Sequence, residues 1–336
     1  MPTIYAALDD RLLVVRGERA SAGARADWSA VETLAGYDFE CIAASDEAPE
    51  RVFVGTAESG LGRSTDKGET WEAVGRFDNR VTAVTVSPHD PDVVWVGTEP
   101  SSVYRSQDGG DTWDLREGLT DLPSAGQWSF PPRPHTHHVR WIAVNPHDPA
   151  HIYVAIEAGA FVRSVDGGET WQAHPEGARR DNHTLATHPD DPCRVYTAAG
   201  DGYAESPDCG ETWIYPQGGL DHRYIWGLAV DPDDPDTVVI SAASGARRAH
   251  TPSTAKAYVY RRDVSADRWT RSMDGLPDAE GTSRAVLATG SAGEFYALTN
   301  CGLFRSSDGG RSWNRLGIDW PDRYASAVGT GLAVVG

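Results

Sequence analysis

The chain has 336 residues, a formal net charge of −19 and a pI near 4.9, and only two of its basic residues are lysines. An acidic surface of this kind argues against nucleic acid and against an anionic membrane as partners, and it favours a halophilic source with a high-salt cytoplasm. No apolar run reaches the roughly twenty residues of a spanning helix, and the first residues lack the pattern of a signal peptide. We therefore expect a cytoplasmic protein.

The chain opens with two runs that have the length and alternation of β-strands, at 3–8 and 11–16. From residue 64 onward an eight-residue phrase, Ser-x-Asp-x-Gly-x-Thr/Ser-Trp, occurs five times. Repetition at intervals of roughly forty residues is typical of one supersecondary unit stacked many times. The copies lie at 64–71, 106–113, 164–171, 206–213 and 306–313.

The tryptophans give the number of repeats. Five belong to full copies of the phrase, and two more mark degenerate copies that have kept the tryptophan. The series is Trp28, Trp71, Trp113, Trp171, Trp213, Trp269 and Trp313. The third repeat shows four strand-like runs, of which a Pro/Asp turn joins the first two; they are 81–86, 93–97, 103–106 and 112–116. Four strands in each of seven repeats predict an all-β fold, a single seven-bladed β-propeller of four-stranded antiparallel blades over residues 1–336. The apolar run 324–335 would join the N-terminal blade as its inner strand and close the ring.

The repeated phrase resembles the Asp-box, or BNR, repeat of sialidases, sortilin-type receptors, xyloglucanases and the photosystem II assembly factor. The resemblance covers nearly the whole chain and implies a propeller, but it leaves the activity open. Seven blades without partner domains are most similar to the assembly-factor type and to prokaryotic proteins of the sialidase-like, glycosyl hydrolase-like or WD40/YVTN-like kind. Sialidases have six blades and a Phe/Tyr-Arg-Ile-Pro segment that is missing here, so a typical sialidase is not expected.

The aspartates of the phrase are conspicuous, yet we interpret them as structural. Asp and Ser side chains bond nearby backbone amides in such turns, Gly supplies a positive φ, and Trp would pack between blades as a large apolar anchor. The four cysteines show no metal-ligand spacing. Cys193 and Cys209 fall at the same end of one blade, but cytosolic thiols are usually reduced, so we also interpret Cys41, Cys193, Cys209 and Cys301 as unpaired structural residues.

A binding face is indicated by two long insertions, 117–138 and 244–257, which fall on the same side of the predicted ring. Alignment of the inner strands on their Pro turns places five residues in one register at the mouth of the axial channel. These are Glu40, Thr82, Arg140, His183 and Trp226. Charged and aromatic residues that coincide with insertions on one face favour a ligand site, whereas the plainer alternative is a solvated mouth whose charges pair with one another.

Two functions remain open. The first is a binding module for a small polar or anionic, possibly carbohydrate, ligand or for a protein partner. Its candidate residues are Glu40, Arg80, His138, Arg140, His183, Arg223, Tyr224 and Trp226. The second is a glycan-active hydrolase or lyase, in which Glu99 and Glu157 form a carboxylate pair and His183 acts as a base.

Metal coordination by His137, His138 and His183 is the less favoured interpretation of these histidines, because spacing across loops is unspecific. We expect hydrogen bonding or ligand contact instead and predict no cofactor. The oligomeric state stays open.

Overall fold

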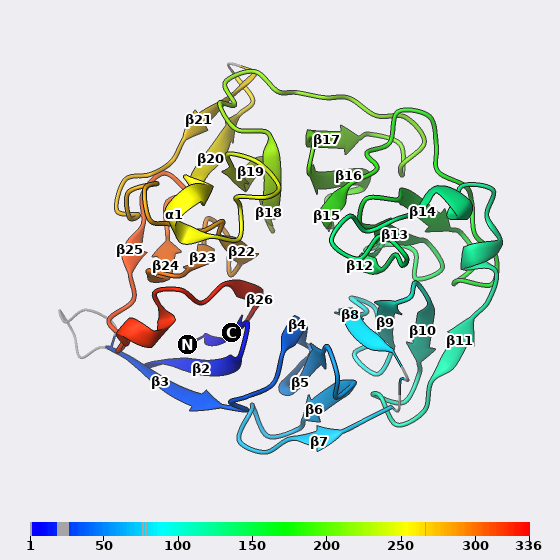
Figure 1. The fold of residues 1–336 in the computed structure, drawn as a ribbon, viewed down its shortest axis with the longest axis horizontal. Coiled ribbons are helices and arrows are strands. Elements are labelled where there is room, and N and C mark those ends of the chain that lie inside the picture. The colour runs from blue at the N-terminus through cyan, green and yellow to red at the C-terminus, as the bar shows by residue number, and fades with distance from the viewer. Residues whose placement is uncertain (1, 19–26, 76, 78, 266) are drawn as a thin grey trace.

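Seven small antiparallel sheets form a closed ring around a central channel (Figure 1). The computed structural model describes residues 2–18, 27–75, 77, 79–265 and 267–336. The predicted seven-bladed β-propeller is therefore confirmed. Each blade runs outward from a strand at the axis, and the second strand of each blade carries a run of buried, mostly apolar residues, such as Ile152–Ile156 and Phe295–Thr299.

The strands of the seven blades, taken from the axis outward, follow the chain with one exception at the closure. They are β26 (Gly329–Val335), β1 (Thr3–Leu8), β2 (Arg11–Glu18) and β3 (Asp27–Thr33); β4 (Phe39–Ser45), β5 (Ala48–Thr56), β6 (Leu61–Ser64) and β7 (Glu72–Ala73); β8 (Arg80–Val86), β9 (Val94–Glu99), β10 (Val103–Ser106) and β11 (Asp114–Arg116); β12 (Val139–Val144), β13 (Ile152–Ile156) and β14 (Ala160–Ser164); β15 (Asn182–His188), β16 (Asp191–Ala199) and β17 (Gly202–Ser206); β18 (Tyr224–Asp231), β19 (Asp234–Ala243), β20 (Tyr258–Asp263) and β21 (Arg268–Arg271); β22 (Val286–Thr289), β23 (Phe295–Thr299), β24 (Gly302–Ser306) and β25 (Asn314–Arg315).

Two blades differ from the four-stranded expectation, because their sheets contain three strands. In each of them a single isolated bridge stands where the outer strand would be, between Arg163 and Gln172 and between Glu205 and Ile214. In four of the other five blades the outer strand is the shortest, because it pairs with one neighbour only; the exception is β3, which has seven residues.

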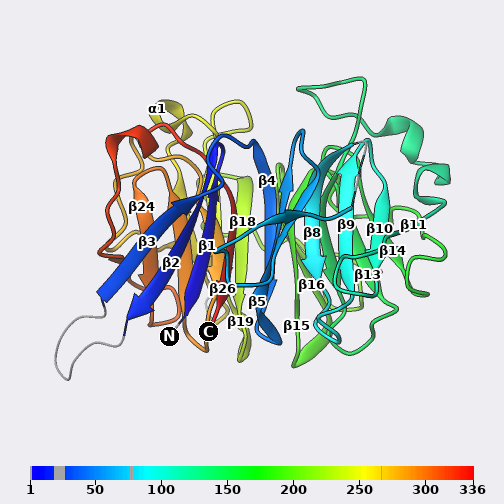
Figure 2. The ribbon, with the colours of Figure 1, turned by 90° about the horizontal axis from the view of Figure 1, so that it is seen from below.

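The ring closes as predicted. β26 pairs antiparallel with β1 from Thr3–Val335 to Leu8–Gly329, and Figure 2 shows the two strands side by side. Outside the sheet, Glu32 of β3 accepts hydrogen bonds from Arg323 and Tyr324 in the short helix η3 (Asp322–Tyr324). The C-terminal segment is thus held to the N-terminal blade at both its inner and its outer side.

The repeat tryptophans pack between blades. Trp213 lies edge-on to Phe161 of the preceding blade, with ring centroids 4.9 Å apart. Trp269, the marker of a degenerate repeat, meets Tyr203 of its preceding blade in the same way at 4.9 Å. The degenerate copy has therefore kept the interface residue, which is why the tryptophan spacing counts blades correctly.

The repeated phrase folds into a self-contained hydrogen-bonded turn. In the last copy the Ser306 hydroxyl donates to Asp308 Oδ1 at 2.8 Å and accepts the Gly310 N–H at 3.0 Å. Asp308 also accepts the Ser312 N–H and hydroxyl at 2.9 and 2.6 Å. Burial would raise the pKa of Asp308, but these bonds outweigh it and lower the pKa to about 2. Gly310 has φ +76°, and a Cβ there would meet Val239 of the preceding blade at 2.6 Å.

Each of the five turns is also tied to the turn between the first two strands of its blade. The fourth residue of the phrase donates its N–H to a backbone carbonyl there, as from Gly109 to Asp92 at 2.9 Å. In one blade a disulfide, Cys193–Cys209, reinforces this tie. The expectation that all four cysteines are unpaired is therefore wrong; it rested on the redox state of a presumed compartment, whereas the fold brings these two together.

The two insertions project from the same face of the ring, as Figure 2 shows for α1 (Pro252–Ala255) and for the loop after β11. That loop contains the short helices η1 (Leu119–Asp121) and η2 (Ala125–Gln127). None of the helices in the described part of the chain has the length and apolar character needed to cross a membrane.

Candidate binding site at the channel mouth

The inner strands of six blades carry a β-bulge at one shared register, and four of the extra residues line the cavity at the channel mouth. A bulge bends its strand and re-aims one side chain. The register shifts single out five residues that the sequence alignment placed together, and the closing strand adds a sixth. They are Glu40, Thr82, Arg140, His183, Trp226 and Thr330. The predicted common register is therefore confirmed.

A repeated bond between neighbouring blades identifies the seventh member. Thr82 Oγ1 donates to the carbonyl of Val139, the residue before the next bulge, at 2.6 Å. His183 Nδ1 likewise meets the carbonyl of Ile225 at 2.7 Å, and the Arg284 guanidinium donates to that of Gly329 at 2.7 Å. Arg284 thus holds the matching position in the remaining blade. We call these seven residues the bulge ring.

One side of the mouth holds the two carboxylates predicted as a catalytic pair. Arg133 donates from both ends of its guanidinium to Glu99, with Nε 2.6 Å from Oε1. His138 Nε2 lies 3.0 Å from Glu157 Oε2, and its Nδ1 lies 3.9 Å from Glu99 Oε2. The imidazole of His138 therefore occupies the space between the two carboxylates.

Both carboxylates are held in their ionised form. Burial would raise the pKa of Glu99, but the bonds and charge of Arg133 hold it below its usual range. Burial also opposes ionisation of Glu157, yet the bond from His138 and the charges around it lower its pKa to about 2. Glycoside hydrolysis needs one carboxyl that stays protonated near neutral pH, and neither group meets that need.

The other side of the mouth holds two buried guanidiniums on one indole. The Arg140 and Arg284 guanidiniums lie 4.7 and 3.8 Å from the Trp226 ring centroid, and the two residues are only 7% and 3% exposed. Arg284 Nε donates to His250 Nδ1 at 3.1 Å. That bond requires a neutral His250, and burial, aided by Arg284, lowers the pKa of His250 to about 3.

Positive charge is in excess on this side. Arg140 Nε lies 3.6 Å from Glu157 Oε2, which His138 already bonds. Burial and the neighbouring Arg140 lower the pKa of Arg284 to about 9, so the Arg284 guanidinium stays charged at neutral pH. Among the described residues no carboxylate lies within ion-pair distance of Arg284.

Between the two sides lies a cavity of about 210 Å³. Its lining joins the bulge ring to the long insertions and consists of Glu40, Phe130, Arg133, His138, Arg140, Glu157, Trp226, His250, Arg284 and Thr330. Further along the axis a second cavity of about 420 Å³ is lined mainly by aliphatic residues of the inner strands. Polar chemistry is therefore concentrated at the mouth.

The remaining predicted site residues differ in whether they lie near the cavity. Arg80 bonds Glu40, its neighbour across the blade junction. Tyr224 packs beside His183 with ring centroids 4.8 Å apart. Arg223 is exposed and does not line the cavity. His137 bonds the Ser101 hydroxyl at 2.8 Å.

The three histidines considered as metal ligands do not converge. Within the described residues, the only group of three or more metal-binding side chain types with ligand atoms close together is Glu157, Asp181 and His183.

Sequence reasoning did not include Arg133 or His250 in the candidate site, and it did not align Arg284 with the bulge register. Arg284 was missed because its blade lacks the Pro turn on which the inner strands were aligned. Arg133 and His250 lie in the insertions, where the direction of a side chain depends on the loop conformation.

Comparison with known proteins gives similarity of fold alone. No protein-family model and no curated protein sequence matches the chain. A solved structure of an ancestral GH74 enzyme matches with a TM-score of 0.63 and 19% identity, over 80% of this chain and 36% of that one. The GH74 enzyme of Niastella koreensis gives 0.62 and 18%, over 82% and 46%. This chain thus spans about a third to a half of the length of these two enzymes.

YCF48 bound to a D1 peptide matches over most of both chains, with a TM-score of 0.59 and 19% identity over 83% of this chain and 82% of that one. The chain is therefore a seven-bladed propeller with a charged, aromatic channel mouth. Its architecture is similar to that of GH74 propeller enzymes and of the protein YCF48.

Proposed function

We propose that the channel mouth binds a small organic anion through a carboxylate group, and that the protein acts as a binding module. The observation that carries this proposal is the placement of Arg140 and Arg284 on the same Trp226 ring, both almost fully buried, with no carboxylate of the described residues in contact with Arg284. Buried charges are normally paired, so an anion from outside would complete the site.

A carboxylate suits the donors and the space. Guanidinium groups bind carboxylates through two parallel hydrogen bonds, which add direction as well as energy. Trp226 offers an apolar wall beside them, and the cavity of about 210 Å³ has room for a small molecule or for the end of a chain. The negative side of the mouth, where Glu99 and Glu157 are already bonded, would orient the polar remainder of the ligand.

Two sources share this chemistry: an acidic sugar and the C-terminus of a peptide. The YCF48 structure with its bound peptide supports the second source, and similarity to GH74 propellers supports a carbohydrate. A glycan hydrolase or lyase that uses Glu99, Glu157 and His183 is the weaker proposal. Both carboxylates are ionised, and His183 is completely buried with Nδ1 bonded to Ile225.

The compartment in which binding occurs stays a prediction. The acidic composition favours a high-salt cytoplasm, whereas a disulfide such as Cys193–Cys209 is usual in oxidising compartments.

Calorimetric titration with acetate, glucuronate and a hexapeptide with either a free or an amidated C-terminus tests the proposal. We expect Arg284→Gln and Arg140→Gln to weaken binding of the free acid roughly tenfold or more, because each hydrogen bond to a charged group contributes about 1.5–3 kcal/mol. Arg223→Gln is the matched control and should bind like the wild type.

The probe that binds more tightly, glucuronate or the peptide with a free C-terminus, identifies the source of the carboxylate, because the two probes share only that group. Equal affinity for free and amidated peptide, together with no effect of Arg284→Gln on any probe, would contradict the proposal. Hydrolysis of a glycoside that Glu99→Gln abolishes would support the enzyme instead.

A further inference from the structure

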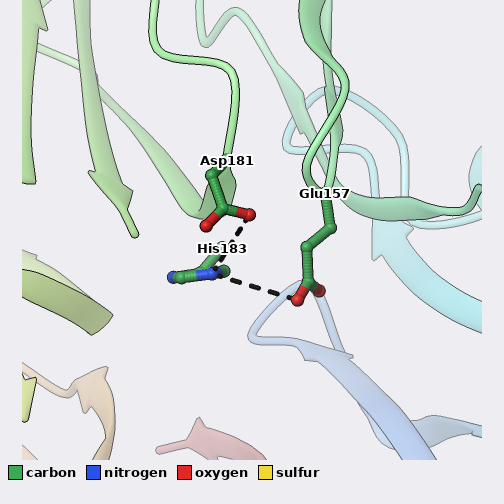
Figure 3. A group of neighbouring side chains, drawn as sticks. All are labelled: Glu157, Asp181 and His183. Atoms are coloured by element: carbon green, nitrogen blue, oxygen red, sulfur yellow. Dashed lines mark ion pairs between the residues drawn. The ribbon is translucent and has the colours of Figure 1, made fainter. Parts of the chain in front are cut away.

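Three side chains at the edge of the mouth direct one ligand atom each toward a common point. Glu157 follows β13, Asp181 precedes β15, and His183 is the bulge residue of β15. Figure 3 shows ion-pair lines from the imidazole of His183 to both carboxylates. Its Nε2 lies 3.7 Å from Asp181 Oδ1 and 3.9 Å from Glu157 Oε1, and the three ligand atoms lie within 4.8 Å of one another.

The tautomer of His183 follows from its other nitrogen. Nδ1 lies 2.7 Å from the carbonyl oxygen of Ile225, which only accepts hydrogen bonds, so Nδ1 carries a proton. In the neutral ring Nε2 then presents its lone pair to the two carboxylates. A backbone carbonyl that fixes the ring in this way is the usual outer partner of a metal-binding histidine.

Nε2 has no hydrogen-bond partner although His183 is 0% exposed. A polar atom buried without a partner is costly. If Nε2 were protonated and bonded to a carboxylate, the separation would be about 2.7–2.9 Å. The observed separations of 3.7 and 3.9 Å exceed this on both sides, so the space between the three atoms suits an ion that touches all of them.

We propose that Glu157, Asp181 and His183 bind one divalent transition-metal cation. The proposal does not rest on anion binding by Arg140 and Arg284, although Glu157 also lines the cavity of that site. One imidazole with two carboxylates suits Zn²⁺ or Mn²⁺ better than Mg²⁺ or Ca²⁺, which prefer oxygen ligands alone. Three protein ligands also leave a position for water or for a ligand oxygen.

The surroundings allow the ion to enter and the ligands to adjust. The Asp181 side chain is 35% exposed, which provides a path from solvent. Bonds from zinc to nitrogen or oxygen are about 2.0–2.2 Å long, so the three atoms must draw slightly closer, and the side chain of Asp181 has the freedom to do so. Its Oδ1 accepts the Ala158 N–H at 3.0 Å, which orients the carboxylate.

The experiment is calorimetric titration of chelator-stripped protein with Zn²⁺ and with Mn²⁺. We expect one site per chain in the wild type, and at least tenfold weaker binding in Asp181→Asn and in His183→Gln. His151→Gln is the matched control, since His151 also has a buried Nε2 without a partner but no pair of carboxylates around it. Co²⁺ absorption gives a second measure, and its ligand-field bands should be lost in His183→Gln.

Thermal melting establishes that each variant is folded; should His183→Gln fail to fold, Asp181→Asn in the loop before β15 still tests the site. Uptake of clearly less than one equivalent by the wild type would overturn the proposal. So would wild-type affinity in a folded Asp181→Asn protein.

Discussion

The repeated turns at the blade edges and the bulge ring at the channel mouth both recur at fixed positions, yet they differ in chemistry. The turns use the same residue types in five copies, and their hydrogen bonds are satisfied within the turn, as Ser306, Asp308 and Ser312 show. The bulge ring uses five residue types at seven equivalent positions. Among the described residues, His183 keeps a buried nitrogen without a hydrogen-bond partner, and Arg284 has no carboxylate within ion-pair distance.

This difference separates the residues that build the fold from those that give it a use. A position that stays the same in every blade meets a demand that every blade makes, namely a tight turn against its neighbour. A position whose residue type varies among the blades is free of that demand. The bulge holds the backbone in one shape while the side chain varies, so a closed scaffold can present a composite site.

Removal of the closing strand should have the largest effect on the scaffold. Deletion of residues 322–336 leaves β1 without its inner partner and removes the bonds of Arg323 and Tyr324 to Glu32. We expect loss of most of the free energy of unfolding, on the order of 5 kcal/mol or more, measured by thermal and urea melts. Addition of a peptide of residues 322–336 should restore part of the melt. A deletion protein that melts like the wild type would contradict the closure.

Removal of the Cys193–Cys209 disulfide measures how much this covalent bond adds to the stability of the protein beyond the backbone hydrogen bond beside it. The bond closes a loop of sequence separation 16, for which the entropy model gives about 3 kcal/mol. Cys193→Ser should lower the melting temperature by a corresponding amount, with Cys301→Ser as the control at a free thiol. Acetate binding should stay unchanged, because the disulfide lies on a blade edge. Equal melting of both variants would show that the backbone tie suffices.

A matched pair of substitutions compares the turn and the ring directly. Ser306→Ala removes the buried hydroxyl that the Gly310 N–H and Asp308 share. Thr82→Val removes the hydroxyl bonded to Val139, with almost no change of shape. Each should cost about 1–2 kcal/mol in urea unfolding, because a buried backbone group loses its partner.

Measurement of acetate binding by the same two variants tests whether Thr82 or Ser306 contributes to the anion site. The hydroxyl of Thr82 already bonds the Val139 carbonyl of the scaffold, so the Thr82→Val protein should bind acetate like the wild type. Weaker binding in Ser306→Ala, with its fold intact, would instead show that the turns contribute to the site.

The smallest effect concerns pH. The bonds from Tyr324 and Arg323 lower the pKa of Glu32 to about 2. A carboxylate with a lowered pKa contributes stability that is present above its ordinary value and lost as the pH falls toward 2. Glu32→Gln should therefore cost up to about 1 kcal/mol at pH 7, and the difference from the wild type should vanish near pH 2. A difference that is independent of pH would contradict this role.

The sequence predicted the fold well because the blade interface demands a tryptophan, and this residue survives even where the rest of the phrase is lost, as at Trp269. It also predicted the common register of Arg140 and His183, because the Pro turns lie at a fixed distance from the bulge. The alignment did not assign Arg284 to this register, because its strand lacks the Pro turn. The disulfide was mispredicted because an argument about compartment outweighed the positions of the two cysteines.

Because β26 pairs with β1, the seven blades form an uninterrupted circle, although the covalent chain is linear. Thr3 lies opposite Val335 in one sheet, so the two ends meet within a single blade, and no other blade is marked as first or last. A circular permutation that joins these ends and opens the chain within the 244–257 insertion would leave all seven sheets with their partners. The order of blades around the axis, and hence the order of chemistries in the bulge ring, is therefore a property of the circle and does not depend on where the chain is cut.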